Sequence, residues 1–557
     1  MSGRDRLIYL PLGGAGEIGM NAYVYGYGPE GKERLILVDL GIAFPDMDST
    51  PGVDVILPDI AWLRERSDRL DGIFITHAQE DHVGGVGHLF RQLDAPVHAR
   101  KFTANIARRK LSEQGQDEDM VKVAEPFPAM IEAGPFQVSF LPISHSIPES
   151  SALVIDSPAG RIIHTGDFKL DRSPVLGEAW DPDLWAEAAK PGVRALVCDS
   201  TNVFNKHEGR SEALVGPNIR ELVSGAKGMV AATTFASNVA RLKSLADAGE
   251  AAGRSICLMG RAMRRMTEAA VEEGLLTDFP KTVSPEDAAS IPRENLMLIV
   301  TGSQGERRAA SAQLSQGKYF GMEMREGDTF LFSSKTIPGN EKDVARIINN
   351  FSELGVDVVT DDDGFYHVSG HANRPDLEAI QQLVDPQVVI PMHGEHRHLR
   401  EHAKLTDSLG RVGVLAPNGT MVDLAGNKPE VVDHVETGRT YLDGSALVGQ
   451  FDGVVRDRIR MALNGHAVVA VMVDDDDEIL EDTWVDLRGL PEMSGSAALA
   501  DLMEQHLAGQ LARVDTRTAG DDEALESLIV KGVRKVAQDE IGKRPEVTVL
   551  ITRLAAE

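Results

Sequence analysis

The amino-acid sequence predicts an α/β protein with several layered domains. The chain has 557 residues, which is too many for one hydrophobic core and suggests about three or four domains. Its composition, with 42% hydrophobic and 26% charged residues, is that of an ordinary soluble globular protein. Short apolar runs typical of strands alternate with helix-like periods along most of the chain, and this pattern indicates sheets covered by helices.

Residues 1–205 are expected to form the first part of one such domain. Apolar segments of strand length are separated by glycine-rich turns, and two helical patterns lie between them. The strand segments are RLIYLPL, NAYVYGY, RLILVDL, GIFITH, FQVSFLP, ALVID, RIIHTGD and RALVCDS, and the helical patterns are GHLFRQL and TANIARRKL.

Residues 206–350 change to a regular alternation of strand and helix, which predicts a parallel sheet in a second domain. The segments are GMVAATTF, NVARLKSLADAGEAA, SICLMG and RAMRRMTEAAVEEGLL. Residues 351–430, with the strand VVIPMHG and the helix EHRHLREHAKL, are similar in character to the first region. We expect residues 431–450 to be a linker and residues 451–557 to form a small C-terminal α/β domain.

Charge and cysteine content limit the class of protein. The formal net charge of −29 argues against a broad basic surface for nucleic acid. A nuclease remains compatible, because metal ions and a few basic side chains can create a local positive field in a cleft. No apolar run reaches the roughly 18 residues of a membrane span, and the first residues lack the apolar stretch of a signal peptide. Cys198 and Cys257 lie in strand-like runs, so we expect buried thiols in a reducing compartment, the cytoplasm.

The segment ITHAQEDHVGG carries the clearest chemical signal. A predicted strand ends there and delivers His77, Gln79, Asp81 and His82 on a loop that enters a helix. Imidazole nitrogen and carboxylate oxygen are the donors of a zinc or manganese centre, and loops at strand ends are where α/β domains hold their chemistry. Taken alone, the segment is also compatible with an ordinary polar turn.

Three further residues of ligand type also follow apolar strands directly. They are His145 in LPISHSIPES, Asp167 in RIIHTGDFKLD and His393 in VVIPMHGEHRH. Any one of them alone is more often a structural histidine or a turn aspartate. Four strand ends that all carry such residues indicate one shared metal centre.

With these residues the sequence resembles the metallo-β-lactamase superfamily, whose hallmark is HxHxDH followed by a His, an Asp and a final His. Within it, the chain is similar to the ribonuclease J family of β-CASP nucleases. The segments that carry the resemblance span nearly the whole chain and occur in the family order: LGGAGEIGMN, VDLGIAFPD, HTGDFKLD, CDSTN, TTFASNVARL, TGSQGE, SSKTIPGNE, HVSGHA and PMHGE.

The resemblance implies an αββα sandwich, interrupted by an inserted α/β β-CASP domain at residues 206–350 and followed by a small C-terminal domain. It also implies two metal positions. His77, His145 and Asp167 would hold one ion, and Asp81, His82, His393 and the bridging Asp167 the other, with a zinc-type centre supplying hydroxide for attack on phosphorus. Asp39 in VDLG resembles the buried aspartate that orients the ligands.

The β-CASP segments imply the substrate contacts. His371 in HVSGHA matches a histidine that serves as general acid or holds the scissile phosphate. Its neighbours His367, Val368, Ser369 and Gly370, together with Ser237 and Asn238 in FASNV, would bind phosphate. For Ser237 and Asn238 a helix N-cap is an equally good interpretation, and both can hold, because helix N-termini bind phosphate. The expected catalytic residues are Asp81, His82, Asp167 and His371.

The chain departs from the family pattern at Gln79, where the third position of HxHxDH asks for His. A neutral amide oxygen is a poor substitute for imidazole towards zinc. Three outcomes follow: a weakened first position, an enzyme that uses one metal at the second position, or an inactive binding protein. Of the one or two Zn²⁺ ions that the resemblance implies, we expect close to one tightly bound metal, with activity that needs added Mn²⁺ or Mg²⁺ at the weakened position.

Three functions are compatible with these residues. The leading hypothesis is a 5′→3′ exoribonuclease with additional endonuclease activity on single-stranded RNA with a 5′-monophosphate, acting in RNA processing and decay. The resemblance implies a homo-oligomer, a dimer or tetramer, within an RNA-decay complex, and no membrane. A small-ester hydrolase of the lactamase or glyoxalase kind would lack HVSGHA and FASNV. The third hypothesis is an RNA-binding or assembly subunit whose site is impaired by Gln79.

Overall fold

The computed structural model describes residues 4–480 and 483–554, which divide into two compact units. The first unit contains residues 57–439 together with the chain before residue 44, and the second contains residues 44–56 and 440–557. Within the described residues, no helix is both long enough and apolar enough to span a membrane.

The first unit is built on two large sheets that pack face to face. The strands are buried over nearly their whole length, because one face of each sheet packs against the other sheet and helices cover the opposite face. Tyr9, Phe74, Phe136, Phe140 and Val197 belong to the fully buried core between the sheets. The first sheet has the strand order β23 (Glu430–His434), β22 (Thr420–Asp423), β1 (Arg6–Gly13), β3 (Ala22–Gly28), β4 (Arg34–Val38), β6 (Leu70–Ile75), β7 (Val97–Ala99), β8 (Val121–Val123).

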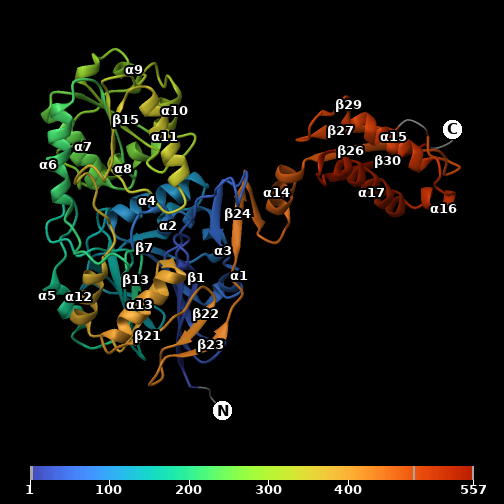
Figure 1. Ribbon diagram of the computed structural model, residues 1–557. Coiled ribbons are helices and arrows are strands. Elements are labelled where there is room, and N and C mark those ends of the chain that lie inside the picture. The colour runs from blue at the N-terminus through green and yellow to red at the C-terminus, as the bar shows by residue number, and fades with distance from the viewer. Residues whose placement is uncertain (1–3, 481–482, 555–557) are drawn as a thin grey trace. The chain divides into compact units, whose positions relative to one another are not determined.

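Helices cover the outer face of each sheet and complete the αββα sandwich that the sequence predicts (Figure 1). The second sheet has the order β21 (Val412–Gly413), β19 (Val388–Met392), β13 (Val193–Asp199), β12 (Gly160–His164), β11 (Ser151–Ser157), β10 (Phe136–Pro142), β9 (Ile131–Ala133). Its outer helices α5 (Pro182–Ala189), α12 (Arg374–Val384) and α13 (His396–Ser408) contribute Trp185, Leu377 and Leu405 to a common core. On the first sheet, α4 (Lys101–Glu113) packs against β7 and β8, and α3 (Val86–Leu93) packs against α4.

The inserted segment forms its own parallel sheet, as its strand–helix alternation predicts. The strand order is β15 (Ser255–Met259), β16 (Leu296–Val300), β14 (Val230–Thr233), β17 (Thr329–Phe332), β18 (Asp357–Val359). Helices cover both faces, as the apolar strands of a parallel sheet require (Figure 1). On one face lie α6 (Val215–Gly225), α7 (Val239–Ala251) and α8 (Arg261–Glu272), and on the other α10 (Ala310–Gln316) and α11 (Glu341–Glu353).

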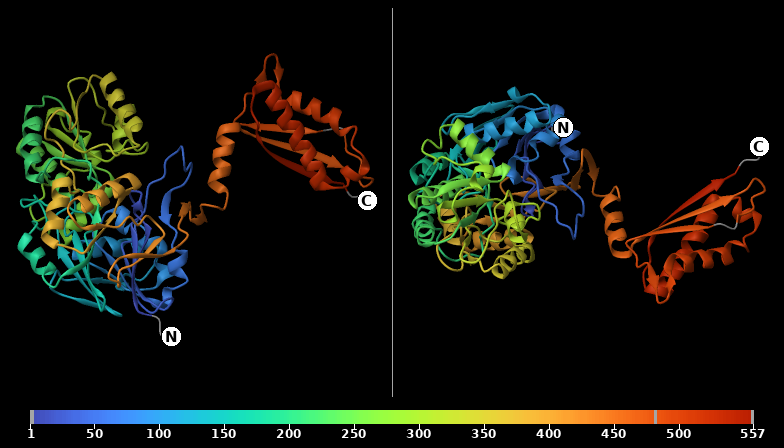
Figure 2. Two further views of the ribbon diagram at one scale, coloured as in Figure 1. Left: turned by 60° about the horizontal axis from the view of Figure 1, so that its bottom comes forward. Right: turned by 90° about the horizontal axis from the view of Figure 1, so that it is seen from above.

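The second unit has a small α/β core of its own. The sheet β27 (Trp484–Arg488), β26 (His466–Val473), β30 (Glu546–Arg553) packs one face on α15 (Leu499–Leu511) and α17 (Asp522–Ile541), which lie side by side (Figure 2). Residues 431–450, expected from sequence to be a linker, contain strands. Most of β23 lies there and pairs with β22, and β24 (Arg439–Asp443) pairs with β25 (Ala446–Gly449).

A buried ion pair joins helix α7 of the insert to Glu212, near the start of the insert. Arg241 on α7 donates from Nε and Nη2 to the two carboxylate oxygens of Glu212, at 2.6 and 2.9 Å. The same guanidinium donates to the carbonyl oxygen of Ser333 at 2.8 Å, and the backbone N–H of Glu212 donates to Asp171 at 3.0 Å. Because Arg241 is inaccessible to solvent, its charge depends on Glu212 for compensation.

Replacing one partner of this pair should destabilise the first unit. In Glu212→Ala the guanidinium stays buried without a counter-charge, and we expect a loss of roughly 3–5 kcal/mol in the free energy of unfolding, measured by urea denaturation followed by circular dichroism. Glu221→Ala, on the exposed side of α6, is the matched control and should change the free energy by less than about 0.5 kcal/mol. Equal midpoints for the two variants would contradict this account of the pair.

Candidate metal centre

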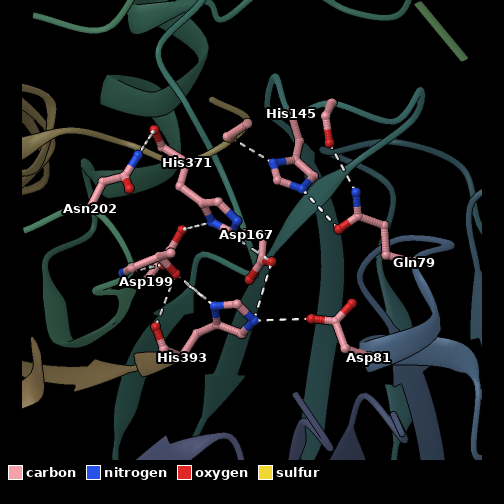
Figure 3. A network of polar contacts seen from close by, with 12 residues as sticks. Gln79, Asp81, His145, Asp167, Asp199, Asn202, His371 and His393 are labelled. Atoms are coloured by element: carbon pink, nitrogen blue, oxygen red, sulfur yellow. Dashed lines mark hydrogen bonds and ion pairs between the residues drawn. The ribbon is translucent and has the colours of Figure 1, made fainter. Parts of the chain in front are cut away.

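Ligand-type side chains converge where strands of the two large sheets end. β6 leads to His77 and then to the short helix α2 (Glu80–Val83), which carries Asp81 and His82. His145 follows β10, Asp167 follows β12 and His393 follows β19. The side chains from both sheets face a common space in which Asp167 is central (Figure 3). The residues chosen from sequence as metal ligands are therefore brought together, although they span more than 300 positions of the chain.

The backbone takes unusual conformations to make this convergence. Asp39 and His393 both adopt positive φ, 61° and 48°, which is uncommon for residues with a side chain and marks a functional constraint. Gly41 lies against the loop that carries Asp81, and a Cβ there would meet the carbonyl oxygen of Asp81 at 1.6 Å. Only glycine permits this approach of two backbones, which explains why the VDLG turn ends in glycine.

His82, His393, Asp81 and Asp167 form the ligand group of the second metal position (the second group). His82 Nε2 lies 3.2 Å from Asp167 Oδ2 and 3.5 Å from Asp81 Oδ2. His393 Nε2 lies 3.1 Å from Asp81 Oδ2 and 3.4 Å from Asp167 Oδ2. Such spacing between donor atoms is what one shared ion requires, since each donor must lie about 2.1 Å from it.

His77, His145 and Asp167 form the ligand group of the first metal position (the first group), with ligand atoms within 4.8 Å of one another. His145 Nδ1 donates to the carbonyl oxygen of Gly370 at 2.6 Å, so the ring turns Nε2 into the centre. Gln79 lies directly beside this group, with Oε1 at 3.4 Å from His77 Nε2 and 3.2 Å from His145 Nε2.

Asp167 is the observation that tests whether the site fits a metal. Its side chain is 1% exposed, and neither carboxylate oxygen has a hydrogen-bond partner of acceptable geometry among the described residues. A buried carboxylate that lacks hydrogen bonds of good geometry is costly unless positive charge lies beside it, and the imidazoles of His82 and His393 lie at 3.2 and 3.4 Å from it. The nitrogen and oxygen donors around it suit Zn²⁺ or Mn²⁺, so the residues present fit a divalent metal centre that Asp167 would bridge.

Asp39 supports the metal centre by holding the imidazole of His82. It is fully buried and lies 2.7 Å from His82 Nδ1. Thr76 donates to it from its backbone N–H at 2.7 Å and from Oγ1 at 2.9 Å. A carboxylate bonded to the far nitrogen of a ligand imidazole fixes the tautomer and the ring orientation. This is the contact that the resemblance implied for Asp39.

The pKa values of the histidines differ between the two groups. Burial, assisted by the charge of His82, lowers the pKa of His77 well below its ordinary value, and burial lowers the pKa of His145 to about 4. Burial also lowers the pKa values of His82 and His393, but the carboxylate of Asp167 and the carboxylates near it outweigh burial. They raise the pKa of His82 well above its ordinary value and that of His393 to about 10. Metal binding at the second group must therefore displace protons from these rings.

Asp199 is a site residue that the sequence analysis quoted within CDSTN but assigned no role. It ends strand β13, and Oδ2 lies 2.8 Å from His371 Nδ1. Burial opposes protonation of His371, but the Asp199 carboxylate outweighs it and raises the pKa of this imidazole. The signal that could have identified Asp199 was available, since it follows the apolar run RALVC as the other ligands follow their strands.

The neighbouring Thr201 and Asn202 hold two functional loops. Thr201 Oγ1 lies 2.8 Å from His393 Nδ1. Asn202 Nδ2 donates to Ser369 Oγ at 2.8 Å and to the carbonyl oxygen of His371 at 3.2 Å, so it fixes the HVSGHA loop beside the centre (Figure 3).

The remaining candidates for phosphate binding differ in whether they lie near the metal centre. Asn238 accepts from the backbone N–H of Arg241 at 2.9 Å and is the N-cap of α7, which confirms the capping interpretation for this residue. Ser237 Oγ faces the centre and accepts from Gln79 Nε2 at 3.4 Å. Val368 packs in the core of the insert. His367 lies against Arg241, and burial, assisted by nearby cationic side chains, lowers its pKa to about 3.

Four family profiles match the chain. They are "Metallo-beta-lactamase superfamily" at residues 16–197, "Ribonuclease J, beta-CASP domain" at 227–351, "Zn-dependent metallo-hydrolase RNA specificity domain" at 362–417 and "Ribonuclease J C-terminal domain" at 453–554. Together they cover most of the chain and follow the order of the domains described above.

Relatives named Ribonuclease J match over most of the chain. The chain is 39% identical to Ribonuclease J of Sinorhizobium meliloti over 100% of this chain and 98% of the relative. It is 36% identical to Ribonuclease J of Corynebacterium glutamicum over 86% of this chain and 67% of the relative. Among solved structures, a protein of unknown function from Enterococcus faecalis shares the fold, with a TM-score of 0.51 and 16% identity over 75% of this chain and 100% of that one.

Removing a ligand of the second group should abolish hydrolysis without unfolding the protein. We expect Asp81→Ala or His82→Ala to reduce RNA cleavage to background, because the pocket loses a donor and the ion it holds. In His82→Ala the Asp39 carboxylate keeps its two bonds from Thr76, so the far-ultraviolet circular dichroism should match the parent. His88→Ala, on the adjacent helix α3 and outside the centre, should cleave normally. Near-parental turnover of either ligand variant would refute the metal assignment.

Proposed function

The chain belongs to the ribonuclease J family and is a ribonuclease, and from this premise we propose that it degrades single-stranded RNA as a 5′→3′ exonuclease with additional endonuclease activity. The observation that carries the proposal is the convergence of two ligand groups on the buried carboxylate of Asp167, next to an imidazole held by Asp199. Chemistry and substrate contacts thus lie within one site.

The site residues have two roles in phosphodiester hydrolysis, metal binding and proton donation. His77, His145 and Asp167 would hold one ion, and Asp81, His82, His393 and Asp167 the other. Divalent ions held there would lower the pKa of water towards about 7 and supply hydroxide at neutral pH. His371, whose pKa is raised by Asp199, carries the proton that the leaving oxygen needs and acts as general acid.

Phosphate recognition is assigned to the hydroxyl groups beside His371. Ser369 Oγ accepts hydrogen bonds from Asn202 and from the backbone N–H of His371 at 3.1 Å, so its own proton is free to donate. Ser237 Oγ accepts from Gln79 and has the same freedom. Hydroxyl donors of this kind, with the backbone at Gly370 and the N-terminus of α7 behind Asn238, suit one phosphate group.

The finer properties of the centre and of the assembly are carried over from the family. We propose Zn²⁺ as the tightly held metal, with Mn²⁺ or Mg²⁺ at the position that Gln79 weakens. We also propose a homo-oligomer, a dimer or tetramer, that acts in an RNA-decay complex in the cytoplasm. The alternative of an RNA-binding subunit without catalysis predicts no cleavage with any added metal, and the assays below test it.

The state of the 5′ end should control the rate. We expect 5′-monophosphorylated RNA to be degraded faster than the same RNA with a 5′-triphosphate, because a pocket sized for one phosphate clashes with a triphosphate. Degradation of the two end-labelled substrates under single-turnover conditions is the measurement. Equal rates would remove the 5′-monophosphate preference, and a faster reaction of the triphosphate would reverse it.

Asp199 should act through His371 and not independently. We expect Asp199→Asn and His371→Ala each to lower the rate of the chemical step by about 10²-fold. The double variant should be no slower than His371→Ala, since residues that work as a unit are non-additive. Metal content should stay at the parental level in all three variants. Additive losses, or loss of metal in Asp199→Asn, would contradict the positioning role of Asp199.

A further inference from the structure

The Gln79 side chain enters the metal centre although it lies at a helix start. Gln79 precedes α2 in the N-cap position, yet its side chain makes no capping hydrogen bond. Its Oε1 instead approaches the Nε2 atoms of His77 and His145, at 3.4 and 3.2 Å. Donor atoms bound to one ion at about 2.1 Å lie roughly 3.0–3.4 Å apart, so the amide oxygen occupies the position of a further ligand.

Two serine hydroxyls orient the amide. Gln79 Nε2 donates to Ser146 Oγ at 2.9 Å and to Ser237 Oγ at 3.4 Å. Ser146 follows His145 directly, and Ser237 comes from the inserted domain. With the nitrogen engaged by these hydroxyls, the carbonyl oxygen is turned towards the imidazoles of His77 and His145, and Figure 3 shows the contact with His145.

The hydrogen bonds at Nδ1 of His77 and of His145 decide which ring nitrogen carries the proton, and they leave the Nε2 lone pairs facing Gln79. The carbonyl oxygen of Gly370 only accepts, so His145 carries its proton on Nδ1. Thr76 donates its single hydroxyl proton to Asp39 at 2.9 Å, so it accepts from His77 Nδ1 at 2.9 Å. In the neutral rings, both Nε2 atoms then present lone pairs to Gln79 Oε1. Three lone pairs at this spacing repel one another unless a cation lies between them.

We propose that Gln79 is a direct ligand of the first metal position through its carbonyl oxygen, and that it shifts the selectivity of this position from Zn²⁺ towards Mn²⁺. The donors become two imidazoles, the shared Asp167 and a neutral oxygen. Oxygen donors suit Mn²⁺, whereas zinc gains most from the nitrogen that this chain has lost. The first position is then an exchangeable Mn²⁺ site beside a tightly held ion at the second. This inference rests on the proposed metal centre and adds the ligand role of Gln79, from which a selectivity for Mn²⁺ over Zn²⁺ at this position follows.

The test is metal binding, read without any assay of cleavage. The full-length protein and its variants are desalted identically, their metal content is measured by elemental analysis, and Mn²⁺ and Zn²⁺ affinities are obtained by titration, with Mn²⁺ followed by electron paramagnetic resonance. We expect the parent to retain about one tightly held ion and to bind one added Mn²⁺. Gln79→His should tighten Zn²⁺ at the first position by at least about tenfold relative to Mn²⁺.

Two further variants separate ligation from simple space filling. Gln79→Ala should weaken Mn²⁺ by at least about tenfold because the oxygen is lost, and Ser146→Ala should weaken it by about tenfold because the amide loses its anchor. Gln137→His, at an exposed position of β10, is the matched control and should behave as the parent.

The outcomes distinguish the two levels of the proposal. If Gln79→Ala binds Mn²⁺ as the parent does, or if Gln79→His leaves the ratio of Zn²⁺ to Mn²⁺ affinity unchanged, the ligand role of Gln79 is overturned while the metal centre stands. Retention of two tightly bound Zn²⁺ ions by the parent overturns the selectivity claim. If the parent retains no metal and binds no Mn²⁺, the proposed metal centre itself fails.

Discussion

A buried carboxylate that needs positive charge governs the architecture of this site. Asp167 is withdrawn from water and has no hydrogen-bond partner of acceptable geometry among the described residues. The free-energy cost of that arrangement is large unless cations surround the carboxylate. The imidazoles of His82 and His393 lie within 3.4 Å of it, and both groups of ligand atoms share it. The positive φ of Asp39 and of His393, and the glycine at position 41, follow from the need to bring strand ends to this one point.

The insert and the HVSGHA loop that follows it both contribute contacts to the centre. Gly370 accepts the hydrogen bond that turns His145 inward, and Ser237 accepts from the Gln79 amide. His371 reaches Asp199 at the end of a strand of the second large sheet. Ligand orientation and substrate contact therefore depend on the same junction between the two domains. The buried Arg241–Glu212 pair stabilises that junction from the insert side.

The strongly acidic composition of the chain agrees with this local design. A net charge of −29 disfavours binding to RNA through a broad electrostatic surface. The residues that contact phosphate in our proposal are hydroxyl groups, an imidazole and a helix N-terminus, and the remaining positive charge comes from ions held by acidic ligands. In this proposal, the positive charge that attracts RNA phosphate lies in the metal site, where it also promotes hydrolysis.

Sequence alone determined the fold class, because apolar runs of strand length and helical periods show which segments pack in a core wherever strands and helices are regular. It also determined most ligand candidates, because each one directly follows an apolar strand. Tertiary structure decided what depends on long-range approach. The role of Asp199 needed a partner, His371, that no local pattern names, and β24 within the segment 431–450 pairs with β5 (Val55–Pro58), which is far away in the chain. Gln79 shows the difference most directly. The sequence marks it as a missing imidazole, but only the positions of Ser146, Ser237 and the two histidines decide that its oxygen points into the centre, since the rotation of an amide is set by the groups around it and not by its neighbours in the chain.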